Sequence, residues 1–165
     1  MRDIAIKLRA LGCAIGALAV ISTTACTTAK TESAPNAAAT TASATSDGLT
    51  PFQIEHGIGP VTAPVTLDVS VDRAMAKSGN EVFEQKCSAC HKMGERYVGP
   101  ALGDVFTRRS PAFVMNMALN PQGMMEKHPV TKKLFAEYLV GMPNQNLSRD
   151  EARQVVEFLR TQAHE

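Results

Sequence analysis

The sequence predicts a small all-α domain of three to four helices in residues 70–165. Apolar side chains recur there every three to four residues in separate stretches, and helix-capping residues precede two of these stretches. Only one segment alternates with period two, so no second strand is available for it to pair with. Aromatic residues make up 5% of the chain and tryptophan is absent, so a domain of this size needs a further apolar group in its core.

The first and last helices of this domain have the clearest patterns. The first is expected to begin near Asp72 and end at residue 86, with one face made of Met75, Gly79, Val82, Phe83 and Lys86. The last is expected to begin at Ser148, which forms a capping box with Glu151. Its apolar stripe consists of Ala152, Val155, Val156 and Leu159, with Phe158 beside it.

Two shorter helices are expected between these. Ser110 and Pro111 form a good N-cap and first-turn pair, so a helix is expected to run from them to Leu119. A fourth helix is expected over about 130–140, and the residues after Pro121 are expected to form a loop.

An extended strap, residues 51–69, is expected to lie across the helical domain. Its apolar residues are interspersed with glycine and proline, which predicts an ordered but irregular segment. The alternation with polar residues indicates one buried face, made of Val65, Leu67, Val69 and, just beyond the strap, Val71. His56 is interpreted as a surface or structurally satisfied histidine rather than an additional metal ligand.

A C-x-x-C-H motif, formed by Cys87, Cys90 and His91, follows directly after the first expected helix. Thiols three positions apart share one face of a helical turn, where each can add across one of the two vinyl groups on a haem edge. The adjoining imidazole can then bind the iron through one ring nitrogen while the other donates to a carbonyl group. The motif therefore predicts one covalently bound haem c.

Three other interpretations of the two thiols fit the sequence less well. A redox dithiol of the thioredoxin type requires a strand before the first cysteine, whereas the residues before Cys87 have a helical pattern. A zinc site requires four ligands, and no second cysteine pair or closely spaced histidine pair is present. A disulfide would leave His91 unexplained, so haem attachment is favoured.

The first 25 residues have the pattern of an export signal. Three basic residues precede an apolar run of 12 residues, 10–21. As a helix this run spans about 18 Å, short of the ~30 Å hydrocarbon core, which disfavours a permanent membrane span. The small residues leading into Cys26 resemble the lipobox of bacterial lipoproteins, although Thr23 stands where that family usually has a large aliphatic residue. Lipidation of Cys26 is favoured over ordinary cleavage nearby.

Residues 26–50 are expected to form a lipid-anchored flexible linker. Of the 24 residues from 27 to 50, 17 are alanine, threonine or serine. A coil of this length reaches roughly 25 to 30 Å, although it is equally compatible with a simple spacer. The sequence thus predicts an exported protein on the periplasmic or cell-envelope face of a membrane, with no cysteine pair left for a disulfide.

Residues 70–163 resemble a class I cytochrome c domain, because four motifs occur in that family's order. They are Gly79 with Phe83 before C-x-x-C-H, the run Gly99-Pro100-Ala101-Leu102 after it, Met142-Pro143, and Phe158 in the last helix. The resemblance implies that the carbonyl of Pro100 accepts the N–H of His91. It also implies that the last helix crosses the first where Phe158 packs against Gly79. It also implies helices packed around one covalent haem.

The sixth iron ligand is expected to be Met142, although methionine more often fills core space. Pro143 follows it directly, and a short segment leads from it to the Ser148 cap. Met124 and Met125, expected in the loop after Pro121 with His128 behind them, remain the alternatives. A soft thioether favours ferrous iron, so His/Met ligation is expected to raise the reduction potential.

The expected function is that of a single-electron carrier that catalyses no substrate turnover. A membrane redox complex would supply electrons and a terminal reductase or oxidase would accept them. Residues 50–61 and 95–105 are similar to lipoprotein cytochromes that accompany nitrous-oxide reductase. The alternatives are a haem-based gas or peroxide sensor, a small haem enzyme with an open distal site, and a relay subunit within a permanent complex.

Charge is unevenly distributed along the chain. Residues 86–133 contain eight basic and three acidic residues. This excess suggests a basic rim that steers an acidic redox partner, and a solvated mixed surface is the equally plausible alternative. No concentrated basic stretch with interleaved aromatics is present, so nucleic-acid binding is not expected.

Overall fold

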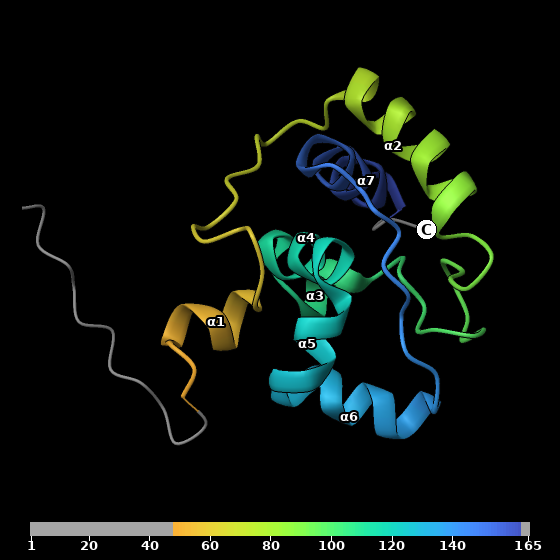
Figure 1. The fold of residues 1–165 in the computed structure, drawn as a ribbon. Helices are drawn as coiled ribbons and strands as arrows, with labels where there is room; N and C mark the ends of the chain where they lie inside the picture. Colours follow the sequence, from red (N-terminus) through yellow and green to blue (C-terminus); the bar gives the residue numbers. More distant parts are fainter. Residues whose placement is uncertain (1–47, 163–165) are drawn as a thin grey trace, which may run out of the picture. The chain divides into compact units, whose positions relative to one another are not determined.

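A computed structural model of the chain describes residues 48–162 (Figure 1). These residues form seven helices and no strand: α1 Pro51–His56, α2 Arg73–Lys86, α3 Val105–Arg108, α4 Pro111–Leu119, α5 Pro121–Lys127, α6 Pro129–Tyr138 and α7 Arg149–Gln162. None of the helices described is both long and apolar enough to cross a bilayer. The predicted export signal, Cys26 and nearly all of the predicted linker lie outside the described residues.

The predicted all-α fold is confirmed, and the four expected helices correspond to α2, α4, α6 and α7. Their starts follow the local signals. The Ser110 side chain accepts the N–H of Phe113 at the start of α4, and Ser148 and Glu151 form the expected reciprocal pair of hydrogen bonds before α7. The structure adds three short helices, α1, α3 and α5, that were not expected.

Helices α2 and α7 make the most extensive helix pair of the described chain, and they lie next to each other in Figure 1. Gly79 permits this approach, because a Cβ atom there would collide with the backbone of Gln154 and lie 3.0 Å from the Cβ of Phe158. The rings of Phe83 and Phe158 lie 5.3 Å apart. Together with Val105, Val155 and Leu159, Phe83 forms one of two core clusters, and Phe158 packs against it.

The strap differs in two ways from the expectation. It begins with a helix, α1, because Thr50 and Gln53 form a capping box and Pro51 occupies the first turn. The expected alternation holds only in part. Val65 and Leu67 pack against the second core cluster, which includes Val61, Ala112, Met115, Ala152 and Val156, whereas Val69 is fully exposed.

The expected loop after Pro121 is also wrong, since Met124 and Met125 lie in helix α5. Pro121 occupies the first turn of this helix rather than breaking it, and the Asn120 side chain accepts the N–H of Gly123. The pair Asn120-Pro121 marks the end of helix α4, as expected, and it is also a signal for the start of the next helix.

Buried polar side chains attach the strap to the helices. Asn116 is fully buried; its Oδ1 accepts the N–H of Val61 at 3.0 Å and its Nδ2 donates to the carbonyls of His56 and Val61. His128, also fully buried, donates from Nε2 to the carbonyls of Gln53 and Ile54, both at 3.1 Å. These bonds join backbone groups of the strap to side chains that are themselves fully buried and need partners.

Candidate functional site

The two thiols and the imidazole of the C-x-x-C-H motif lie on a tight turn after α2. The N–H of Cys87 caps the helix by donating to the carbonyl of Phe83, and the N–H groups of Cys90 and His91 donate to the carbonyl of Cys87 at 3.0 and 2.9 Å. Both cysteines are half-buried, and no disulfide joins them. Burial, with a smaller contribution from Cys90, raises the pKa of Cys87 to about 11.

The orientation of His91 is set by the loop that follows it. Its Nδ1 lies 2.9 Å from the carbonyl oxygen of Pro100, the contact that the family resemblance implied. Because a carbonyl can only accept, Nδ1 carries the proton and Nε2 is left with its lone pair free. Gly99 allows the close approach, since a Cβ there would lie 2.5 Å from Cε1 of His91.

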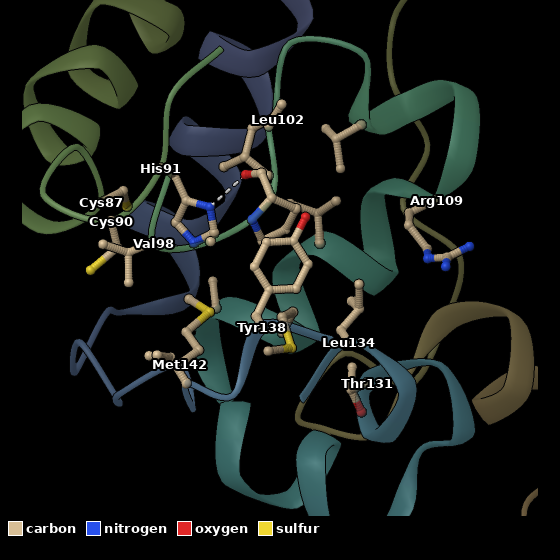
Figure 2. Close-up of a pocket in the computed structure, with 18 of the residues that line it drawn as sticks. Cys87, Cys90, His91, Val98, Leu102, Arg109, Thr131, Leu134, Tyr138 and Met142 are labelled. Atoms are coloured by element: carbon tan, nitrogen blue, oxygen red, sulfur yellow. Dashed lines mark hydrogen bonds between the residues drawn. The ribbon is translucent and has the colours of Figure 1, made fainter. Parts of the chain in front are cut away.

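A large apolar cavity opens beside this turn. Its empty volume is about 1300 Å³, which includes the space open to solvent, and its lining comes from helices α2 to α7 and the segments between them. Cys87, Cys90, His91, Pro100 and Met142 all line it. Figure 2 shows His91 and Met142 pointing into the cavity from different segments of the chain.

The structure separates the candidate sixth ligands. Met142 and Met125 line the cavity, whereas Met124 is fully buried on the opposite side of α5, where its Sδ accepts the N–H of Ile58 at 3.0 Å. His128 is engaged by the strap carbonyls described above. Met124 and His128 are therefore occupied elsewhere, while Met125 shares the cavity with Met142.

Several lining residues were not singled out from the sequence. Helix α6 contributes Thr131, Leu134, Phe135 and Tyr138, whose spacing of three, four and seven residues defines one helical face. That spacing could have identified the face, although not what it faces. Arg108 and Arg109 also line the cavity, and the guanidinium of Arg109 lies 5.2 Å from the ring of Phe113.

The residues present fit a covalently bound haem. The cavity is walled mainly by apolar side chains, two thiols sit at its edge, and one imidazole presents an unprotonated nitrogen. Three thioethers, those of Met117, Met125 and Met142, also line it. Among the residues described, no group of three or more histidine, cysteine, aspartate or glutamate side chains is arranged to hold a metal ion.

Comparison with known proteins defines the class. The family model for cytochrome c matches residues 76–163, so the chain belongs to the cytochrome c family. The protein is a haem-based electron carrier and its cofactor is a covalently attached haem c.

Solved structures agree with this membership. The chain is similar to the cytochrome c from Rhodothermus marinus, with 44% identity over 68% of this chain and 97% of that one, and a TM-score of 0.65. It is also similar to an engineered form of that protein, Rma TDE, at 43% identity over 70% of this chain and 99% of that one, with a TM-score of 0.65. A third match is Rma TDE bound to a carbene intermediate, with 43% identity, the same coverage and a TM-score of 0.63. No curated protein sequence matches the chain.

Proposed function

We propose that the protein is an exported, lipid-tethered monohaem cytochrome c that passes single electrons to a terminal reductase or oxidase. Cys87 and Cys90 would hold the haem, and His91 and Met142 would bind its iron. The observation that carries this proposal is the hydrogen bond from Nδ1 of His91 to Pro100, which leaves Nε2 unprotonated in a cavity that Met142 also lines.

Attachment of the haem requires only addition chemistry. Each cysteine sulfur forms a bond to one carbon of a vinyl group, and the thiol hydrogen goes to the other vinyl carbon, so no oxidant is consumed. Once bound, the haem supplies an iron that gains and loses one electron reversibly.

The residues of the chain set the conditions for that exchange. The Pro100 carbonyl holds the imidazole of His91 in one tautomer and makes it a stronger donor. The thioether of Met142 favours the ferrous state, which raises the reduction potential. Apolar walls formed by residues such as Phe83, Val105 and Leu159 exclude water and add to this effect.

A docking face for the redox partner surrounds the cavity opening. Val98, Phe135 and Val140 line the cavity and are also partly exposed, and Leu139 beside them is 78% exposed. The basic side chains expected to steer an acidic partner include Lys92, Arg96, Lys127, Lys132 and Lys133, all exposed. An apolar centre with a basic surround suits rapid, weak association with an acidic surface.

The proposed tether connects this domain to a membrane through lipidated Cys26, so a membrane redox complex is the proposed electron donor. Similarity of residues 50–61 and 95–105 to cytochromes that accompany nitrous-oxide reductase makes that enzyme our first choice as acceptor. Cys26→Ser is expected to release the protein from washed membranes. Transfer rates to the acceptor should fall as ionic strength rises; unchanged rates would exclude the basic docking face.

Spectroscopy of the haem-loaded protein tests the ligand assignment. The ferric wild type should show the near-infrared charge-transfer band of a thioether ligand, and the ferrous form should bind carbon monoxide slowly. Met142→Ala should abolish the band and accelerate binding, whereas Met125→Ala, the matched control, should retain it. Rapid carbon monoxide binding by the wild type would instead indicate a sensor or a small haem enzyme with an open distal site.

A further inference from the structure

The segment between α6 and α7 carries Met142 with little hydrogen bonding of its own. Within the part of the chain that the structure describes, residues 140–147 make no hydrogen bond to another segment. The segment is fixed at its two ends, by the last turn of α6 and by the capping box of Ser148 and Glu151. The position of Met142 therefore depends on how firmly those ends are held.

Arg96 holds the first of these ends from a different part of the chain. Its Nη2 donates to the carbonyl oxygen of Glu137 at 3.1 Å and its Nη1 to the Oε1 of Glu137 at 3.3 Å. Its Cζ lies 4.0 Å from the ring centroid of Tyr138, which lines the cavity. A guanidinium here meets one of the last carbonyls of α6, where the helix dipole favours a cation.

The geometry indicates which of these contacts matters. The side chains of Arg96 and Glu137 are 55% and 56% exposed, so their charge pair contributes little. A planar, forked cation can donate to the Glu137 carbonyl and lie over the Tyr138 ring at the same time. Lysine would keep the charge but could not make both contacts together as well.

The loop that carries Arg96 is tied to the C-x-x-C-H turn, because the N–H of Tyr97 donates to the carbonyl of Gly99, and the N–H of Gly99 donates to the carbonyl of Cys90. We propose that Arg96 is a positioning residue that fastens the end of α6 to the loop beside His91. It thereby keeps Met142 on the iron and the sixth position closed to other ligands. This inference rests on the proposed role of Met142 as a ligand.

Carbon monoxide binding to the ferrous, haem-loaded full chain measures this effect. Carbon monoxide binds only molecules in which Met142 has left the iron, so its binding rate reports the open fraction. Arg96→Gln should raise that rate about fivefold. Arg96→Lys should also bind carbon monoxide faster than the wild type, with most of the same increase. The control Lys77→Gly removes an exposed cation and weakens α2 away from the cavity, so it should leave the rate unchanged.

A double-mutant cycle with Tyr138→Leu locates the interaction, and the combined variant should accelerate binding less than the product of the two single effects. If the wild type lacks the near-infrared band, the proposed ligation by Met142 fails. If the band is present, two results would overturn the role of Arg96. The first is a carbon monoxide binding rate in Arg96→Gln or Arg96→Lys that equals the wild-type rate. The second is an acceleration in Lys77→Gly as large as that in Arg96→Gln.

Discussion

Residues 87–103 and residues 121–147 line the same cavity, yet the structure holds them in different ways. The first region is bonded to itself: the N–H groups of Gly99, Leu102 and Gly103 donate to the carbonyls of residues 90, 92 and 93. The second region is held from outside by the strap, through His128 and through the sulfur of Met124. The side of the site that contains His91, its proximal side, is therefore held by bonds within its own segment. The side that contains Met142, its distal side, is held by residues far away in the sequence.

This difference coincides with a boundary in the chain. The match to the cytochrome c family begins at residue 76, so the strap lies outside the matched residues. The contacts around the region of Met142, the proposed thioether ligand, therefore include residues that the family model does not match. Substitutions in the strap contacts should act on ligand exchange at Met142 before they affect His91.

The largest effect is expected for His128→Ala. The imidazole is fully buried. Its removal takes away the bonds that it makes to the carbonyl of Ile54 and the N–H of Val130, and leaves the Gln53 carbonyl with only the N–H of Gly57. The free energy of unfolding should fall by about 3 kcal/mol. Urea unfolding of the haem-loaded protein measures this loss, and the carbon monoxide rate should rise with it.

His56→Ala provides the control, because His56 lies in the strap itself and its imidazole bonds only one side chain outside the strap, that of Ser110, at 2.8 Å. Its removal should cost about 1 kcal/mol and leave the carbon monoxide rate unchanged. Unchanged carbon monoxide rates in both variants would show that the distal side does not depend on the strap.

A second pair of variants compares the two sides directly. In Gly99→Ala the new Cβ would lie 2.5 Å from Cε1 of His91, so the imidazole must shift from the Pro100 carbonyl, at a cost of about 2 kcal/mol. In Gly141→Ala the new Cβ would lie 3.4 Å from Met125, an ordinary contact, and stability should change by less than about 0.5 kcal/mol. Denaturant unfolding and potentiometric titration measure both, and equal losses would contradict the comparison.

The self-bonded region could be predicted from sequence because its signals are local. The C-x-x-C-H motif and the Gly99-Pro100 run contact each other across nine positions, and the family resemblance implied the contact of His91 with Pro100. The Ser110 and Ser148 caps likewise define the starts of α4 and α7. A capping side chain bonds a backbone group three residues away, so the pattern already contains both partners.

The distal region could not be predicted in the same way, since its partners are remote. Arg96 contacts a residue 41 positions away, and Met124 bonds a residue 66 positions away. Helix α5 was missed because Pro121 both ends one helix and starts the next. Side-chain burial and tertiary hydrogen bonds, rather than local propensity, decide which methionine of α5 enters the cavity.

Strain at the start of the Met142 segment gives a smaller test. Leu139 has φ 58° and ψ 17°, the left-handed region that glycine adopts without strain, and its side chain is 78% exposed. Leu139→Gly should therefore stabilise the protein by about 0.5 to 1 kcal/mol. Leu139→Ala keeps the strain and should change stability little. A stabilisation by alanine equal to that by glycine, measured by thermal unfolding, would contradict the assignment of strain.

The smallest predicted effect is a pH dependence of stability. It arises from His128, which bonds the strap, and not from the residues proposed to bind the haem. Burial, together with the nearby positive charge of Arg109, lowers the pKa of His128 and outweighs its hydrogen bonds to the carbonyls of Ile54 and Gln53. The unfolded chain, with an ordinary histidine pKa of 6.5, then binds a proton that the folded chain does not. Stability should therefore fall below about pH 6.5, by at most about 0.4 kcal/mol between pH 6.5 and pH 6. Urea unfolding should show this decline in the wild type but not in His128→Gln, and parallel declines in the two proteins would assign it to other groups.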